Sequence, residues 1–243
     1  MDVYGHRGAA GEAPENTIAG CRHAIERGAR HLELDLRLSA DNKLMVIHDA
    51  KVNRTTDHRG SVSRYNADDL WAMDGRRTGP PWPRKRDCGI PTLAALLDAT
   101  PEIKGYYLEV KTGPGTRSGL IIDALGAHFP DRRSARNVVI TSLNRKFLTS
   151  IRQTLPHVPL GLISVRGDII NTLRDFHFDE LHLQWSAINP VTVLLIKSLG
   201  IRVAGWTIND PQIVRNLHRL KVNSIITDYP SMALPLVASL ERK

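Results

Sequence analysis

The chain has 243 residues, of which 42% are hydrophobic and 24% charged, and this composition excludes a disordered or fibrous protein. The length fits one α/β barrel of about 250 residues, although length alone also allows two smaller domains. The formal net charge of +8 favours anionic partners, but aromatic residues make up only 5% and are scattered, so we expect no nucleic-acid partner. No apolar run approaches the roughly 18 residues of a membrane helix, so we expect no transmembrane segment.

Short apolar runs typical of strands alternate with helical patterns along most of the chain. The expected strands are Val3–His6, His31–Leu36, Tyr106–Lys111, Val138–Ser142, Leu160–Ser164, Glu180–Gln184, Arg202–Thr207 and Ser224–Thr227. The helical patterns fall at Thr17–Arg27, Pro91–Thr100, Ser118–His128, Arg145–Leu155, Ile169–Phe176, Pro190–Ser198, Pro211–Arg219 and Ser231–Leu240. Strands that alternate with helices form a parallel sheet, and closing this sheet gives a (β/α)8 TIM barrel, which is the fold we expect.

An open, doubly wound sheet is the competing architecture. It normally carries a glycine-rich turn after its first strand, and the segment from Gly5 to Gly11 does not fit that fingerprint. The helix signals agree with the predicted layout. Asn16 or Thr17 can cap the first helix, and Asp210 and Asp228 precede prolines that open later helices.

One stretch breaks the alternation, because the residues between Asp35 and His48 are too few for a helical crossover. The tetrad Ala40–Lys43 has the composition of a turn, so we expect an antiparallel hairpin. If Ser39 pairs with Leu44, then Asp35 lies opposite His48. Glu33, two residues before Asp35, shares the same face of the strand. A slip of one residue would spoil this arrangement.

An insertion follows the hairpin, from residue 51 to about residue 90, and it is polar and rich in Gly, Pro and Arg. A short helical piece is expected near Ala67–Met73. The densest basic patch of the chain, Arg76–Arg77 with Arg84–Arg86, is either a solvated loop or a means of attracting an anionic substrate. We treat residues 1–243 as a single domain whose insertion covers a site at the strand ends.

Cys21 and Cys88 are the only cysteines, and neither has the spacing of a metal site. Both are interpreted as ordinary thiols of a reducing compartment. The first residues also lack the basic and apolar segments of a secretory signal. These features predict a cytoplasmic location.

Chemically reactive side chains stand at the ends of the expected strands, where the active sites of barrels lie. They are His6, Arg7, Glu33, Asp35, His48, Glu109, Lys111 and Trp206. Three of them are carboxylates, the hard oxygen ligands that Mg²⁺, Ca²⁺ or Mn²⁺ prefers, and without a cation their charges would repel one another. We therefore expect one divalent cation at Glu33, Asp35 and Glu109.

Two imidazoles and two fixed cations complete this set. Because imidazole both takes and gives protons near neutral pH, His6 and His48 suit proton transfer during phosphodiester cleavage. Arg7 and Lys111 supply positive charge for a phosphate. Each residue alone also has a structural explanation, such as a core position for Trp206, and their joint placement is what favours a site. Four other histidines are assigned structural roles: His23, His31, His58 and His182.

Ordered motifs along nearly the whole chain resemble those of the glycerophosphodiester phosphodiesterases. These motifs are His6–Gly8, Pro14–Thr17, Glu33–Asp35, His48–Asp49, Glu109–Lys111, Trp206–Asn209 and Ile226–Pro230. The resemblance implies a metal-dependent (β/α)8 barrel that hydrolyses glycerophosphodiesters to sn-glycerol 3-phosphate and an alcohol. For single residues it implies three roles: metal binding by Glu33, Asp35 and Glu109; acid–base catalysis by His6 and His48; and substrate contacts by Arg7, Lys111 and, on the glycerol side, Trp206.

Two other functions use the same residues. A lysophospholipase D or a sphingomyelinase-like enzyme would act on lipid head groups and would need an apolar channel or an interfacial surface, which the polar insertion disfavours. A non-catalytic barrel that binds a phosphate ligand is disfavoured because every side chain needed for catalysis is present. The expected partner is a small-molecule glycerophosphodiester; its alcohol, the physiological metal and the oligomeric state are left open by the sequence.

Overall fold

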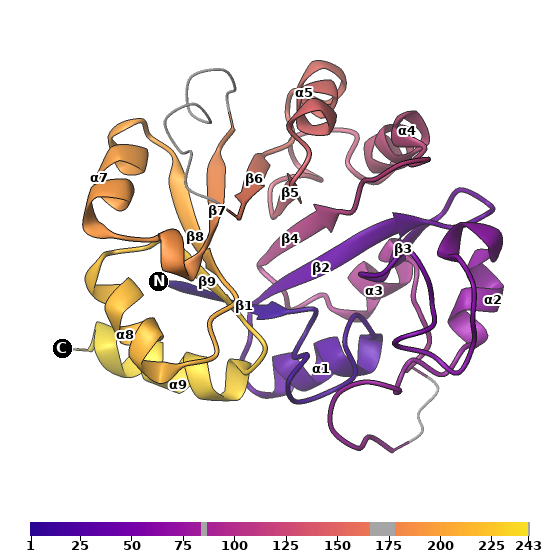
Figure 1. Cartoon of the computed structure of the whole chain (residues 1–243), viewed down its shortest axis with the longest axis horizontal. Coiled ribbons are helices and arrows are strands. Elements are labelled where there is room, and N and C mark those ends of the chain that lie inside the picture. The colour runs from indigo at the N-terminus through magenta and orange to yellow at the C-terminus, as the bar shows by residue number, and fades with distance from the viewer. Residues whose placement is uncertain (84–86, 166–177, 243) are drawn as a thin grey trace.

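The computed structural model describes residues 1–83, 87–165 and 178–242, and within them eight parallel strands close into a barrel (Figure 1). The barrel strands are β1 (Asp2–His6), β2 (His31–Leu38), β4 (Gly105–Val110), β5 (Val138–Ser142), β6 (Leu160–Ser164), β7 (Glu180–Gln184), β8 (Arg202–Trp206) and β9 (Ser224–Thr227). Their order is β1-β9-β8-β7-β6-β5-β4-β2, and β2 pairs with β1 to complete the ring. The expected (β/α)8 barrel is confirmed, and the open sheet is excluded.

Helices pack outside the barrel with bounds close to those predicted. They are α1 (Ile18–Glu26), α3 (Leu93–Ala99), α4 (Ser118–His128), α5 (Arg145–Thr154), α7 (Pro190–Ser198), α8 (Pro211–Arg219) and α9 (Pro230–Glu241). Thr17 caps α1, and Asp210 caps α8 as expected. Asp228 does not cap α9, because Tyr229 holds the cap position and the Asp228 carboxylate bonds to other side chains. The helix expected at Ile169–Phe176 lies outside the described residues.

The predicted hairpin is present, since β3 (Leu44–Val46) pairs antiparallel with the end of β2, but its predicted register is wrong by one residue. Leu38 rather than Ser39 pairs with Leu44, so His48 lies one residue beyond the position opposite Asp35. The physical reason lies in the turn, where the Ser39 hydroxyl accepts a backbone amide at 2.9 Å and so belongs to the turn. His48 still reaches the site because the strand ends before it.

The insertion after the hairpin packs with β3 around a second hydrophobic cluster. It contains a 3-10 turn, η1 (Val62–Arg64), and the short helix α2 (Ala67–Ala72). The cluster consists of Met45, Ile47, Val52, Val62, Ala67, Leu70, Met73 and Ile90. In the basic patch, Arg76 forms an ion pair with a nearby aspartate and Arg77 donates to backbone carbonyls, whereas Arg84–Arg86 lie outside the described residues. The described part of the patch therefore holds the loop together.

A polar layer fills the floor of the barrel. The rings of Tyr4 and Tyr107 stack with centroids 3.6 Å apart, and the Tyr107 hydroxyl donates to Glu180 at 2.6 Å. Arg202 donates to the same carboxylate at 3.0 Å, which satisfies the charge of this buried acid. The pocket described below therefore opens above a closed floor, at the carboxyl ends of the strands.

Gly8 lets α1 pack closely against the loop that follows β1. Its φ of 90° lies in the left-handed region, and a Cβ at this position would meet the backbone of Gly20 and Cys21 at 3.0 Å. Cys21 and Cys88 are both buried and are not joined in a disulfide. Among the helices of the described residues, none is long and apolar enough to cross a membrane.

Candidate active site

Three carboxylates come together where β2 and β4 run side by side. Glu33 and Asp35 are two residues apart on β2 and so share a face, and Glu109 on β4 is the register partner of Asp35. One carboxylate oxygen from each of the three lies within 4.8 Å of the other two. Glu33 is only 4% exposed and Asp35 is fully buried. The parallel pairing of two strands therefore assembles the acidic cluster that the sequence predicted.

The charges in this cluster are unevenly compensated. Burial is the larger cause and the charge of Asp35 the next among those that raise the pKa of Glu33 to about 8. Burial also acts to raise the pKa of Asp35, but Lys111 and Arg7 outweigh that effect and hold this pKa far below its usual range. The negative charges of the carboxylates repel one another, and Glu33 is the residue most affected. A set of carboxylate oxygens in this state suits a divalent cation such as Mg²⁺, Ca²⁺ or Mn²⁺, which would offset the repulsion.

Two cations border the carboxylates. Arg7 follows β1, with its Nε 3.1 Å from Oδ2 of Asp35 and its Nη1 2.9 Å from Oε1 of Glu15. Lys111 follows β4, with its Nζ 2.9 Å from Oδ1 of Asp35 and 2.5 Å from Oε1 of Glu109. Both side chains therefore stand where an anionic substrate would meet the acidic cluster.

His6 is held from the opposite end of the chain. Its Nδ1 lies 2.6 Å from Oδ1 of Asp228, which follows β9, and Asn209 donates to the other oxygen of that carboxylate at 2.6 Å. Burial alone would lower the pKa of His6, but the hydrogen bond to Asp228 and the charge of Glu33 raise it above its usual value. Because Nδ1 is engaged, Nε2 is the nitrogen left free, 3.8 Å from Glu33.

His48 is held in the same way by the residue that follows it. Its Nδ1 lies 2.7 Å from Oδ1 of Asp49, and Arg54 donates to both oxygens of that carboxylate, at 2.9 and 3.0 Å. The backbone carbonyl of His48 accepts a hydrogen bond from Nε of Arg37 at 2.7 Å. Burial lowers the pKa of His48, so its neutral form is favoured.

A pocket of about 210 Å³ unites these side chains. Asp35 lies beneath it and is fully buried. Trp206, at the end of β8, forms part of the wall, and its indole donates to the carbonyl of His182 at 3.2 Å. His182 also lines the pocket, whereas a structural role alone is expected for it from the sequence. The predicted residues that line the pocket are His6, Arg7, Glu33, His48, Glu109, Lys111 and Trp206.

The residues that orient this set are not predicted from the sequence. Asp228 was interpreted as a helix cap, although its position directly after a barrel strand was a signal for the site. Asn16 was interpreted as a cap as well, but its amide donates to Asp35 at 2.8 Å. Asp49 stands next to His48, and this adjacency was the available signal. Arg54 lies in the insertion, where no periodic pattern marks it.

The chain is similar in sequence to known enzymes. The chain is 31% identical over 244 residues to the glycerophosphodiester phosphodiesterase of Caldanaerobacter subterraneus, covering 97% of each chain. It is 29% identical over 248 residues to the glycerophosphodiester phosphodiesterase of Bacillus subtilis, covering 93% of this chain and 83% of that protein.

Solved structures share the fold. An Oleispira antarctica phosphodiesterase in complex with the product sn-glycerol-3-phosphate superposes with a TM-score of 0.83 at 24% identity, covering 98% of this chain and 97% of that one. The Agrobacterium tumefaciens glycerophosphodiester phosphodiesterase gives 0.79 at 23% identity, covering 98% and 99%. The glycerophosphoryl diester phosphodiesterase family profile matches residues 6–232, and the chain belongs to that family of enzymes.

Proposed function

We propose that this protein is a divalent-metal-dependent phosphodiesterase that hydrolyses glycerophosphodiesters to sn-glycerol 3-phosphate and an alcohol. The observation that carries the proposal is the pocket at the strand ends, in which three carboxylates, two oriented imidazoles and two cations line or underlie one space. Metal binding is assigned to Glu33, Asp35 and Glu109. A divalent cation bound there supplies positive charge for the oxygens of the phosphoryl group.

The two histidines are assigned the proton transfers. One group must take a proton from the attacking hydroxyl, and another must give a proton to the departing alkoxide. His6 and His48 each have Nδ1 bonded to a carboxylate, which fixes the orientation of the ring and leaves Nε2 for the transfer. Two imidazoles oriented in this way suit a general acid and a general base.

The remaining residues are assigned to binding. Arg7 and Lys111 contact the phosphate, because both lie at the pocket and both carry fixed positive charge. Trp206 lines the glycerol side of the pocket, where its ring packs against the carbon atoms of glycerol.

The attacking group is either the 2-hydroxyl of the glycerol or a water molecule. Attack by the hydroxyl forms a cyclic phosphate first, and water then opens it, whereas attack by water gives glycerol phosphate directly. Turnover in ¹⁸O-labelled water, followed by mass spectrometry for a cyclic product at early times, separates the two routes.

An add-back assay tests the proposed function. Protein treated with a chelator receives Mg²⁺, Mn²⁺ or Ca²⁺ in turn, and release of sn-glycerol 3-phosphate is measured on several glycerophosphodiesters. We expect activity only with a cation, and a loss of about 10²- to 10⁴-fold in His6→Ala and in His48→Ala. Full activity after chelation, or in either variant, would contradict the proposal.

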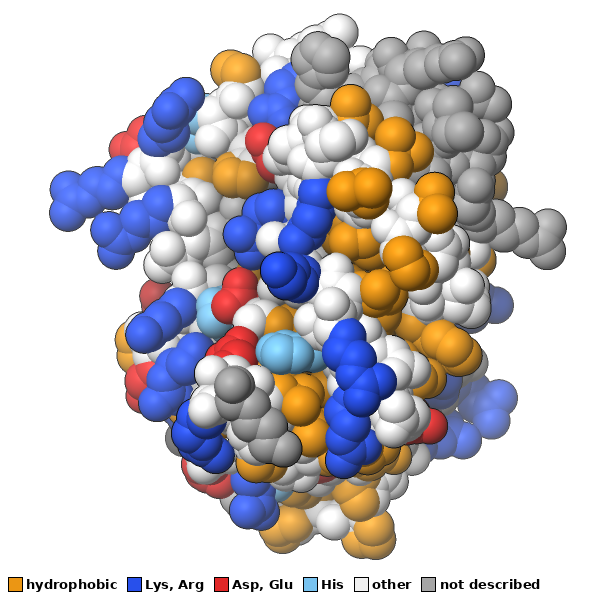
Figure 2. All heavy atoms as spheres, turned by 90° about the vertical axis from the view of Figure 1, so that its left-hand side faces the viewer, with side chains coloured by type: hydrophobic (Ala, Val, Ile, Leu, Met, Phe, Trp, Pro, Cys, Tyr) orange, Lys and Arg blue, Asp and Glu red, His pale blue; other side chains and the backbone are white. Residues whose placement is uncertain are grey.

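A second candidate function is hydrolysis of the head group of a lysophospholipid. The observation that favours it is the outer face of α7, where Val191, Leu194 and Leu199 are exposed. Figure 2 shows hydrophobic side chains gathered over this part of the molecule. Turnover of glycerophosphocholine against that of its acylated counterpart decides between the two functions.

We also infer a cytoplasmic location. It is supported by Cys21 and Cys88, which are buried and are not joined in a disulfide, as suits a reducing compartment. Burial raises the pKa of Cys21 to about 12, which keeps this thiol protonated and unreactive. Fractionation of cells that express the tagged protein tests this inference, and recovery of the protein outside the cytoplasmic fraction would refute it.

A further inference from the structure

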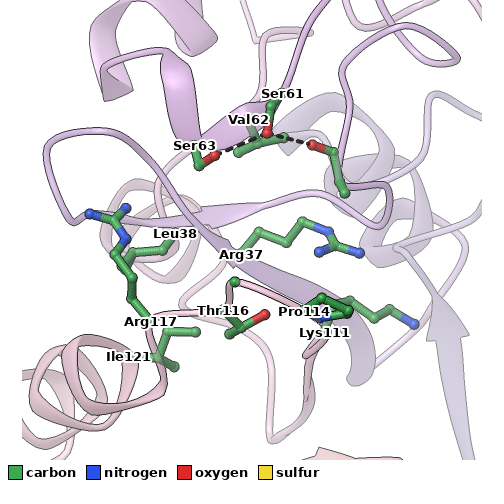
Figure 3. Close-up of a pocket in the computed structure, with 12 residues that line it drawn as sticks. Arg37, Leu38, Ser61, Val62, Ser63, Lys111, Pro114, Thr116, Arg117 and Ile121 are labelled. Carbon is green, nitrogen blue, oxygen red and sulfur yellow. Dashed lines mark hydrogen bonds between the residues drawn. The ribbon is translucent and has the colours of Figure 1, made fainter.

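The active-site pocket has a charged side and a largely apolar side. The charged side comes from β1 to β4 and the residues that follow them, and Lys111 at its edge also lines a second cavity, of about 130 Å³, with Arg37 and Arg117 (Figure 3). The other strands, β5 to β9, complete the ring. The apolar residues that they bring to the pocket are Leu143, Ile163, Trp206 and Ile226. A hydroxyl group of a ligand needs a polar partner on this side, and the described residues offer few.

His182, on β7, is the ionisable residue on this apolar side among the described residues that line the pocket. Its ring packs over Gly161 of the neighbouring β6, where a Cβ would lie 3.0 Å from Nε2 and 3.3 Å from Cδ2. The ring therefore turns its Nε2–Cδ2 edge towards β6. Because Nδ1 is the ring atom opposite that edge, it points away from β6 and into the barrel.

A carboxylate faces the other nitrogen of this ring. Nε2 of His182 lies 3.4 Å from Oε2 of Glu180, the buried acid of the barrel floor. A carboxylate in this position favours the tautomer with the proton on Nε2, which leaves the lone pair on Nδ1. No residue of the described part of the chain forms a hydrogen bond with Nδ1. His182 therefore offers an unused acceptor to the pocket.

Two neighbours place this acceptor beside the tryptophan of the pocket. The indole of Trp206 donates to the backbone carbonyl of His182 at 3.2 Å. On β5, Thr141 is the register partner of Gly161, and its Cγ2 lies 2.9 Å from the same Cβ position. The hydroxyl of Thr141 is buried and has no partner within the described residues. This part of the wall is therefore polar and incompletely satisfied, as suits the binding of a hydroxyl group.

We propose that Nδ1 of His182 accepts a hydrogen bond from the 1-hydroxyl of the glycerol half of the substrate, and so determines specificity for glycerol that is unsubstituted at this position. The inference rests on the proposed function, which places the phosphate at Arg7 and Lys111 and the glycerol at Trp206. The 1-hydroxyl is the group of the glycerol farthest from the phosphate, so it reaches the half of the ring that bears His182. A substrate acylated at this oxygen has no proton to donate and is disfavoured.

Substrates that differ by one oxygen test the proposal. The holoenzyme is assayed on glycerophosphocholine, glycerophosphoethanolamine and glycerophosphoglycerol, and on the analogue of each that lacks the 1-hydroxyl but keeps the 2-hydroxyl. On the compounds that are turned over, we expect kcat/KM to be about 10- to 100-fold lower for the analogue, because Nδ1 is then left without a partner. Equal kcat/KM values for substrate and analogue would overturn the inference.

Two variants of the histidine assign this discrimination to Nδ1. His182→Leu removes the acceptor, and we expect the ratio of the two kcat/KM values to fall to about threefold or less, mainly through loss on the parent substrate. His182→Asn keeps an acceptor, since its Oδ1 can stand near the place of Nδ1, and its ratio should stay closer to that of the wild-type enzyme. His31→Leu is the matched control, because His31 lies at the amino end of β2 and does not line the pocket. It should keep the wild-type ratio.

The ratio separates specificity from a structural effect. A purely structural role for His182 would lower kcat/KM equally on substrate and analogue and leave the ratio unchanged, which would overturn the inference. A ratio in His182→Asn no larger than that in His182→Leu would also overturn it. The comparison of substrates by the wild-type enzyme decides even where a variant fails to fold. Absence of turnover on all three parent substrates would instead contradict the proposed function, and the inference with it.

Discussion

Each imidazole of the site depends on a single carboxylate, and for His6 this carboxylate belongs to Asp228. The substitution Asp228→Asn keeps the shape of the side chain but removes its charge, so the ring of His6 loses the partner that orients it. We expect kcat to fall by about 10- to 100-fold with little change in Tm. Asp210→Asn changes a helix cap that does not line the pocket, at a position where asparagine caps as well as aspartate, and should keep full activity. Undiminished kcat in Asp228→Asn would show that His6 needs no such partner.

Arg54 joins two carboxylates of the site, those of Asp49 and Glu15. Hydrogen bonds from Arg54 lower the pKa of Asp49 from its usual 3.8 to about 2. A carboxyl group whose pKa is lower in the folded than in the unfolded protein stabilises the fold at pH values above its unfolded-state pKa. This stabilisation is lost as the pH falls towards 2. We expect Arg54→Gln to reduce the free energy of unfolding by up to about 1 kcal/mol above about pH 5, because these groups are partly exposed.

Urea unfolding at a series of pH values measures this effect. The difference between the wild-type protein and Arg54→Gln should shrink between about pH 4 and pH 2. Arg133→Gln, in an exposed loop, should show no such dependence. A difference that stays constant down to the lowest pH would mean that Arg54 acts through packing rather than through charge.

At the scale of an element, the contact between α1 and the loop after β1 depends on Gly8. Gly8→Ala adds a Cβ to a residue with left-handed backbone conformation and places it 3.0 Å from the backbone of α1. We expect the free energy of unfolding to fall by about 1–3 kcal/mol. Gly28→Ala is the matched control, because Gly28 has a φ of 98° but nothing within 4 Å of its Cβ. Chemical denaturation should show the larger loss for Gly8→Ala. Equal losses would assign the cost to backbone conformation alone.

The elements could be predicted from the sequence because apolar runs and caps are local signals. The strands Val138–Ser142 and Leu160–Ser164 have the predicted bounds, since each is an apolar run between polar turns. The hairpin register could not be predicted, because the Ser39 hydroxyl decides where the turn ends and spacing does not encode that hydrogen bond. The same limit applies to Asp228. Its position before a helix suggests a cap, and its local sequence does not indicate the hydrogen bond with His6, which is distant in the chain.

The part of the site that lies at the ends of the barrel strands could be predicted from the sequence, because these ends converge. Glu33, Asp35 and Glu109 could be grouped because a parallel barrel brings the ends of all strands to one face. Arg37 and Arg117 could not be grouped, because the cavity they line depends on how the insertion folds over β2. A loop of this kind has no periodic pattern from which its path can be deduced.

At the scale of the whole molecule, the metal site that we propose at the acidic cluster lowers the stability of the metal-free fold. The buried charge of Glu33 opposes folding, as its raised pKa indicates, so Glu33→Gln should be more stable than the wild-type protein in the presence of a chelator. A divalent cation at about 100 times its Kd should stabilise the wild-type protein by about 2.7 kcal/mol. It should stabilise Glu33→Gln much less.

Thermal unfolding with and without Mg²⁺, Mn²⁺ or Ca²⁺ checks this expectation. Asp68→Asn removes one negative charge from an exposed position and should respond to the cations as the wild-type protein does. If Glu33→Gln gained as much in Tm from the cations as the wild-type protein, the cation would have to bind elsewhere.

The barrel closes between its first and last strands, β1 and β9, and Asp228 reaches His6 across that seam. A chain emerging from the ribosome carries His6 long before its aspartate, because Asp228 follows 222 residues later. The unfinished polypeptide therefore lacks an aligned imidazole on this side, and hydrolytic competence arrives together with the last strand. Hydrolysis that depends on the aligned imidazole of His6 is therefore delayed until β9 has been synthesised and the barrel has closed.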